Sequence, residues 1–223
     1  QPPVIWEKLR FDKLRGANLR QADFFDICLE AERGDSSFPR SFDVIVGNPP
    51  FESQFTEAAD AVCKIRGQGE VRIPDKQVAY LFLDQCLPKL SRNGRLCLIQ
   101  SSNFLYNLNS HSFRSAVARG GRLEKVLDFT SIRGLFEGAD VKTVAVLASS
   151  SGSDRIDHFT FRRTFKTAER LGFELDHYDR HQLTSSEIAD DPRAARANLL
   201  GGGRLGEIVS RISRMRSLEE YVT

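Results

Sequence analysis

The sequence contains no run of about 18 apolar residues, so no membrane-spanning helix is expected. No charged-then-apolar leader opens it, which predicts a cytoplasmic protein without a membrane partner. Neither sign of charge dominates, since 32 Lys and Arg residues stand against 30 Asp and Glu residues. The net charge of +2 therefore does not by itself indicate a nucleic-acid partner, although a local basic groove remains compatible with it.

Cysteine and histidine are scarce, and their spacing is unlike that of a metal site. His177 and His181 are four residues apart, but they lie in a polar stretch without a third ligand. The cysteines form no Cys-x-x-Cys pair, which favours reduced thiols over a disulfide framework; they are Cys28, Cys63, Cys86 and Cys97. We expect no bound metal.

Over the first 150 residues, strand-like and helix-like patterns alternate. Residues 44–46 are a continuous apolar run, which is typical of a strand covered on both faces. From Pro74 to Leu90 apolar residues recur every four positions, as on one face of a helix. The alternation predicts an α/β sheet covered on both sides. The expected strands lie at 18–26, 44–46, 95–102, 122–129 and 141–149, and the expected helices at 4–15, 74–90 and 110–118.

After residue 150 the pattern changes. The stretch SSSGSD is typical of a linker, residues 156–163 suit an exposed edge strand, and residues 176–200 are polar with little periodicity. An amphipathic helix with several arginines is expected at 204–216. We therefore predict two parts: a catalytic part at 1–150, and a mostly helical or irregular extension at 151–223 that leads toward a further domain.

The residues with the clearest chemical meaning follow the strand at 44–46. Asn48 offers an amide oxygen that can accept a hydrogen bond from an exocyclic amino group, and the carbonyl of Pro49 can accept a second. Pro49 and Pro50 stiffen the loop, so ordering it costs little entropy. Phe51 offers a face on which a planar base can stack, worth about 1–3 kcal/mol.

Two acceptors directed at one NH2 group expose its nitrogen lone pair for attack on a methyl sulfonium. No general base has to act first, because the amine loses its proton after the transfer. The alternative is an Asn-Pro-Pro turn that only ends a strand. The preceding FDVIVG favours catalysis, because ligands bind at the carboxyl ends of strands in open α/β sheets.

The sequence FDVIVGNPPF resembles the catalytic motif of the S-adenosylmethionine-dependent amino-methyltransferases. KQVAYLFLDQCLPKLSRNGRLCLIQSSNFLYN is similar to the helix and strand that follow this motif in adenine-specific DNA methyltransferases, and RLEKVLDFTSIRGLFEGADVKTVAVLAS resembles the paired strands that end their catalytic domain. The resemblance covers about residues 19–150. It is strongest to the group fused in restriction–modification and phage-defence enzymes. It implies a Rossmann-like methyltransferase sheet, and an enzyme that methylates adenine N6 in DNA.

The same resemblance assigns roles to individual residues. Asn48 and Pro49 would hold the target amino group, with Pro50 in the same motif, and Phe51 would stack on a flipped adenine. Asp23 matches the acid that contacts the adenine of S-adenosylmethionine, and Phe24 could pack on that adenine. Phe136 lies where such enzymes place a second aromatic residue against the flipped base; the alternative is a core residue.

The chain also departs from the family pattern. The glycine-rich donor-binding loop of the family precedes the position of Asp23, and this sequence has no counterpart there. We therefore expect a partial sheet without its first donor-binding strands, and a strand before Asn48 with an unpaired edge. The segment alone is expected to bind the methyl donor weakly or not at all, and so to be inactive. An upstream donor-binding region and a downstream recognition domain would complete the protein.

Other functions share the same four residues. Methyltransferases that act on a protein glutamine, on RNA bases or on cytosine N4 carry related motifs. Asn48 leans away from the cytosine enzymes, which more often begin the motif with serine. About seventy residues follow the sheet, whereas release-factor enzymes usually end soon after it. A non-catalytic relic of the fold is the remaining alternative, and the intact Asp23 and Asn48–Phe51 argue against it.

Overall fold

The computed structural model describes residues 20–34, 39–66, 72–120, 122–136, 141–166 and 171–200, together with 208, 211–212 and 214–216. The described chain is a mixed α/β structure whose main sheet has six strands in the order β1-β2-β4-β3-β5-β8. The main-sheet strands are β1 (Phe42–Gly47), β2 (Leu90–Ser101), β3 (Leu123–Asp128), β4 (Thr143–Ser149), β5 (Arg155–Thr160) and β8 (Arg180–Thr184). A separate hairpin joins β6 (Arg163–Lys166) to β7 (Leu171–Glu174).

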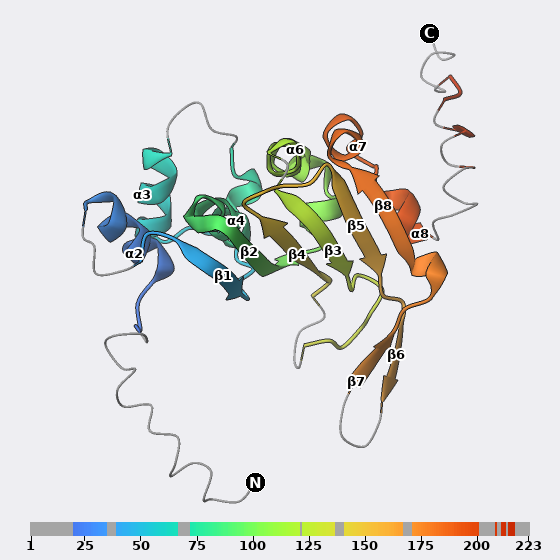
Figure 1. Ribbon diagram of the computed structural model, residues 1–223, viewed down its shortest axis with the longest axis horizontal. Helices are drawn as coiled ribbons and strands as arrows, with labels where there is room; N and C mark the ends of the chain where they lie inside the picture. Colours follow the sequence, from blue (N-terminus) through green and yellow to red (C-terminus); the bar gives the residue numbers. More distant parts are fainter. Residues whose placement is uncertain are drawn as a thin grey trace, which may run out of the picture.

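The sheet is mixed in direction. β1 runs parallel to β2, and β3 runs parallel to β5, while β4 is antiparallel to both β2 and β3. The carboxyl ends of β1, β2, β3 and β5 therefore lie along one edge of the sheet, which we call the carboxyl edge. The hairpin β6–β7 projects from the same edge (Figure 1).

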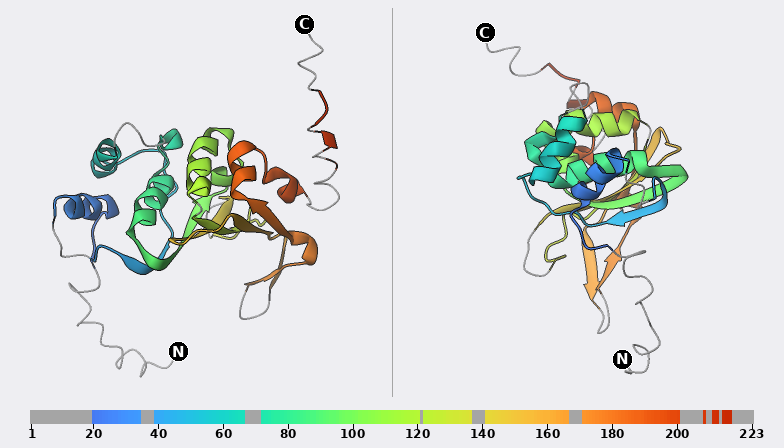
Figure 2. Two further views of the ribbon diagram at one scale, coloured as in Figure 1. Left: turned by 45° about the horizontal axis from the view of Figure 1, so that its top comes forward. Right: turned by 90° about the vertical axis from the view of Figure 1, so that its left-hand side faces the viewer.

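Helices cover one face of the sheet (Figure 2). The core between these two layers contains Leu98 of β2, Val146 of β4 and Phe113 of α6, each at most 2% exposed. The helices are α2 (Phe24–Glu32), α3 (Glu57–Ile65), α4 (Val78–Cys86), α5 (Asn103–Tyr106), α6 (His111–Arg119), α7 (Ser185–Asp190) and α8 (Arg196–Leu200). None of the described helices is long and apolar enough to cross a membrane.

The strand before Asn48 is the first strand of the sheet, with one neighbour among the described residues. This confirms the expected unpaired edge within the described part of the chain. The expected cover on both faces is wrong there, because Val44 is 67% exposed and Val46 is 74% exposed. Because side chains alternate between the two faces of a strand, both valines point away from the core against which Ile45 packs.

One further expectation is corrected. The segment expected as a strand at 18–26, of which residues 20–26 are described, instead begins helix α2 at Phe24. The reason is local: the Asp23 carboxylate accepts the backbone N–H of Phe25 at 2.8 Å, and the apolar Phe25, Cys28 and Leu29 follow at helical spacing and are buried. Helices α4 and α6 confirm the expected helices at 74–90 and 110–118.

The described part of the extension after residue 150 contains more strands than the single one expected there. β5 and β8 belong to the main sheet, and β6 and β7 form the hairpin. β5 is also not an edge strand, because it lies between β3 and β8. Its inward positions carry Ile156 and His158, both fully buried. The apolar–polar alternation here therefore marks a strand with one face packed on the core. The division at residue 150 stays a prediction about domains, while the sheet continues across it.

Candidate functional site

The loop Asn48–Phe51 leaves the sheet at the carboxyl end of β1. Gly47 suits this exit, because a Cβ there would lie 3.0 Å from Cδ2 of Leu98 on the neighbouring strand and the leucine side chain would have to shift. Two hydrogen bonds then fix the loop to the start of α4. The N–H of Val78 donates to the carbonyl of Glu52 at 2.9 Å, and the Gln77 amide donates to the Ser53 hydroxyl at 2.5 Å.

Within this anchored loop, Asn48 remains available. Its side chain is exposed and makes no hydrogen bond to another described residue, whereas Pro49 beside it is buried. Phe51 is half-buried. A fixed backbone with an unengaged amide is the arrangement expected of a residue that accepts a hydrogen bond from a ligand rather than from the fold.

Three of the predicted site residues line one small cavity beside this loop. It has a volume of about 180 Å³, and Asp23, Phe24 and Pro50 contribute to its wall. The cavity is too small for a whole nucleoside donor, since drug-sized ligands occupy about 300–1,000 Å³. It suits a single planar ring. Phe136 is not among the residues that line it.

Asp23 also has a structural role in this wall. One carboxylate oxygen caps α2, while the other lies 3.5 Å from the hydroxyl of Thr56, the residue that caps α3. Phe24 is stacked on Phe82 with ring centroids 4.2 Å apart, so only part of its surface can meet a ligand. Both residues therefore serve the fold as well as any donor site.

Phe136 lies on the connection from β3 to β4 and is half-buried. This connection begins beside a cluster of three aromatic rings that the sequence analysis missed. Phe129 stacks on Phe161 with centroids 4.8 Å apart, and Phe173 of the hairpin packs against both. The signal was present, since Phe129 and Phe161 each come directly after a strand. The cluster joins the hairpin to the carboxyl edge.

A second feature missed from the sequence is a group of buried polar side chains at the same edge. Asp128, at the end of β3, is in contact with Tyr106 and His158. Burial by itself would raise the pKa of Asp128, but hydrogen bonds from His158, Thr130 and Tyr106 outweigh it and hold that pKa below its usual value. Burial and the nearby Asp128 raise the pKa of Tyr106, so its hydroxyl keeps its proton and donates.

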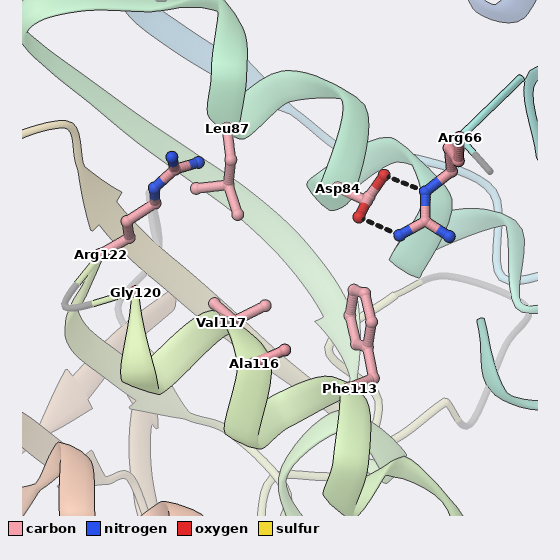
Figure 3. A pocket seen from close by; sticks show the side chains of 8 residues that line it. All are labelled: Arg66, Asp84, Leu87, Phe113, Ala116, Val117, Gly120 and Arg122. Carbon is pink, nitrogen blue, oxygen red and sulfur yellow. Dashed lines mark hydrogen bonds and ion pairs between the residues drawn. The ribbon is translucent and has the colours of Figure 1, made fainter. Parts of the chain in front are cut away.

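Another cavity, of about 270 Å³, opens between α4 and α6 on the helical layer (Figure 3). Arg66 and Asp84 form a two-point ion pair on one wall, with N–O distances of 2.5 and 2.6 Å, and Arg122 lies on the opposite side. None of the predicted site residues lines it. It is therefore separate from the site at the carboxyl edge.

The described residues contain no group of three or more His, Cys, Asp or Glu side chains that could hold a metal ion. All four cysteines are free thiols. Burial raises the pKa of Cys28 to about 11 and that of Cys86 to about 12, which makes both thiols unreactive near neutral pH.

The mixed α/β sheet is consistent with a methyltransferase-like fold. The chain matches the Eco57I restriction-modification methylase family over residues 4–136. More than half of the chain lies within this match, and the chain therefore belongs to that family. No curated protein matches it.

Solved structures support the fold. The methyltransferase subunit of a type I restriction-modification system from Streptococcus thermophilus is 13% identical with a TM-score of 0.54, over 70% of this chain and 38% of that one. A modification subunit of a putative type I restriction enzyme from Vibrio vulnificus YJ016 is 16% identical with a TM-score of 0.50, over 66% of this chain and 34% of that one. The chain thus spans little more than a third of the length of these two proteins.

Proposed function

We propose that this chain is the base-binding part of a DNA methyltransferase that transfers a methyl group from S-adenosylmethionine to the N6 amino group of a flipped adenine. The observation that carries this proposal is the Asn48–Phe51 loop, which is anchored at the carboxyl edge and leaves the Asn48 amide unengaged. Membership in a family of restriction-modification methylases supports it. Asp128 and the aromatic cluster lie at the same edge.

The side chains act by holding the amine. The Asn48 oxygen and the Pro49 carbonyl accept its two N–H groups, which leaves the nitrogen lone pair free to form the new N–C bond. Phe51 stacks on the base and opposes its return to the duplex. The methyl donor, when bound, would supply an electrophilic methyl group; its S–CH3 bond would break as the N–C bond forms, with the electron pair kept by sulfur in the departing thioether. The amine loses its extra proton to solvent after the transfer, so Asn48 does not act as a base.

Only one end of the methyl donor fits the described residues. The cavity lined by Asp23, Phe24 and Pro50 has room for a planar ring such as adenine, with the carboxylate of Asp23 as acceptor for an amino group. The rest of the donor needs other residues. We propose that they belong to a part of the protein that pairs with the free edge of β1 and covers Val44 and Val46.

Methyl transfer by the full-length protein tests this function. Unmethylated DNA is incubated with radiolabelled methyl donor, and label in the DNA is counted for wild type, Asn48→Ala and Asn93→Ala. Asn93 is the matched control, because it is also exposed but lies in β2 toward the opposite edge of the sheet. We expect Asn48→Ala to lower the rate about 100-fold or more and Asn93→Ala to leave it unchanged.

The outcomes separate the alternatives. Label in protein or RNA, with none in DNA, would replace the DNA substrate with a glutamine side chain or an RNA base. Donor binding without transfer to any of them would contradict the proposed reaction, and no donor binding at all would favour a relic of the fold. Equal loss in both asparagine variants would show that the loop after β1 has no special role.

A further inference from the structure

The buried polar group at the end of β3 is unusual for its position in the core. The Asp128 side chain is 0% exposed, as is that of His158. One carboxylate oxygen accepts the backbone N–H of Thr130 at 2.8 Å. The other accepts the Tyr106 hydroxyl and Nε2–H of His158, the latter at 3.3 Å. A buried carboxylate without such donors would be very costly, so these partners are required for it to stay ionised.

The group joins four separate segments of the chain. Tyr106 belongs to α5, which follows β2, while Thr130 begins the connection that carries Phe136. His158 lies on β5, and its Nδ1 accepts the amide of Asn198 on α8 at 3.1 Å. His158 therefore holds its proton on Nε2, which leaves Nδ1 free to accept. We call Tyr106, Asp128, His158 and Asn198 the Asp128 network.

The network lies beside the proposed base site rather than in it. β2 and β4 separate β1 from β3, so the ends of β1 and β3 are three strand spacings, or about 14 Å, apart. Asp128 itself cannot reach a base held by Asn48. The two segments that Asp128 fixes, the one after β2 and the β3–β4 connection, lie closer to Asn48 than Asp128 does. The residues after β2 follow the strand next to Asn48, and the N–H of Ser102 donates to the carbonyl of Lys142 at 2.8 Å.

That hydrogen bond is a second link between the same two segments at the carboxyl edge. The segment after β2 is tied through Tyr106 to Asp128 at the start of the β3–β4 connection, and through Ser102 to Lys142 at its end. Both ends of the connection that carries Phe136 are thus held against the segment neighbouring Asn48. Loss of one donor to Asp128 would loosen this wall without touching Asn48 or the cavity at Asp23.

Resting on the proposed function, we propose that the Asp128 network is a positioning device that holds the wall opposite the Asn48–Phe51 loop at the distance a flipped base requires. Tyr106, Asp128 and His158 are positioning residues, and none of them contacts the base. The network sets the geometry of the base site and is independent of methyl-donor binding, because α2, which Asp23 caps and Phe24 begins, lies on the side of β1 away from β3 (Figure 1).

The test compares two tyrosines in the full-length protein. Tyr106→Phe removes one donor to Asp128, and Tyr80→Phe removes an equivalent hydroxyl, which is bonded to Ser110 at 3.2 Å inside the helical core. Measurements are kcat and KM with DNA, Kd for S-adenosylmethionine and the thermal midpoint. We expect Tyr106→Phe to lower kcat/KM for DNA about tenfold with Kd for the donor unchanged, and Tyr80→Phe to keep kcat/KM. Both should lower the thermal midpoint.

A second pair of variants separates hydrogen bonding from general destabilisation. His158→Gln keeps a donor toward Asp128 and should retain activity within about threefold, whereas His158→Leu should lose at least as much as Tyr106→Phe. If Tyr106→Phe and Tyr80→Phe are equally active, or if the donor Kd rises with the loss, the positioning role is wrong while the methyltransferase function stands. If wild type transfers no methyl group to DNA, the proposed function fails, and this proposal fails with it.

Discussion

The hydroxyl of Thr56 lies 3.5 Å from the carboxylate of Asp23, and these two residues cap neighbouring helices, α3 and α2. Thr56 follows the Asn48–Phe51 loop by five residues, so the contact connects the proposed base site to the proposed donor site. Asp23 thus has two separable properties: an oxygen that caps a helix and a charge beside a cavity. A substitution that keeps one and removes the other distinguishes them.

Asp23→Asn should preserve the fold and weaken donor binding. Asparagine caps helices about as well as aspartate, so Asp23→Asn should change the free energy of unfolding by less than about 0.5 kcal/mol. Asp23→Ala should cost about 1 kcal/mol, because the cap is lost. In the full-length protein, both variants should raise Kd for S-adenosylmethionine about tenfold, since each loses a charge-assisted hydrogen bond. Calorimetric titration and thermal unfolding measure the two effects.

Thr184→Ala is the matched control for this prediction. Thr184 caps α7 through a similar side-chain bond, 3.1 Å from the N–H of Glu187, far along the chain from the cavity. It should lose about 1 kcal/mol of stability and leave Kd for the donor unchanged. If the donor Kd rises in proportion to the loss of stability in all three variants, Asp23 does not belong to the donor site.

The open face of β1 gives a prediction about stability. In this chain alone, Val46→Lys should cost less than about 0.5 kcal/mol, because the side chain is 74% exposed. Ile45→Thr, one residue earlier on the covered face, should cost more than about 1 kcal/mol. In the full-length protein Val46→Lys should become the more damaging of the two. Denaturant unfolding of both variants in both lengths measures this. An unchanged ranking would contradict the proposed pairing at β1.

Phe51 is expected to contribute through its ring face. Phe51→Ala should lower kcat/KM for DNA about 10- to 100-fold, which corresponds to the loss of about 1–3 kcal/mol of base stacking. Phe51→Tyr keeps the face and should stay within about threefold of wild type. Steady-state kinetics with DNA of varied concentration measures both. Equal activity of the alanine and tyrosine variants would show that the base does not stack on this residue.

Acid pH should destabilise the protein in part through His181. Burial, followed by the nearby His158 and Arg162, lowers the pKa of His181 to about 4. Asp179 and Asp128 act in the opposite direction, and Thr160 bonds the ring at 3.3 Å. The unfolded chain binds its proton near pH 6.5. Between about pH 6.5 and 4 the unfolded state therefore holds more protons, so stability falls as pH falls through this window.

His181→Gln should make this dependence shallower, by at most about 1.4 kcal/mol per pH unit. The measurement is the free energy of unfolding by denaturant at several pH values from 7 to 4. An identical slope in wild type and His181→Gln would show that His181 does not titrate on unfolding.

The elements with strong local signals could be predicted from the sequence. The apolar run before Asn48, the helical spacing from Val78 to Cys86 and the paired strands around residues 123 and 149 all appear in the structure at the expected places. The loop at Asn48 could be placed at a strand end for the same reason, since proline cannot continue a sheet ladder. Its anchoring to α4 through Glu52 depends on a contact between segments 26 residues apart, which the local pattern does not contain.

The errors have two physical causes, one local and one tertiary. The aromatic and acidic residues at 23–26 suit a strand by composition, but a capping carboxylate decides for a helix. Alternation at 156–163 suggests an edge strand, but a later segment, β8, pairs with β5 and covers that edge. The Asp128 network is missed because its members are spread from Tyr106 to Asn198 and have no motif. The first case was decided by a local helix cap, and the other two by tertiary contacts.

Nucleoside mass spectrometry on DNA treated with the full-length protein and S-adenosylmethionine tests the central claim most directly. We predict N6-methyladenine with wild type and with Asn93→Ala, and its absence with Asn48→Ala. N4-methylcytosine in place of N6-methyladenine would contradict the adenine assignment while keeping the mechanism at Asn48. Methylation that persists in Asn48→Ala would contradict the role of Asn48, because the chemistry would then lie outside the loop after β1.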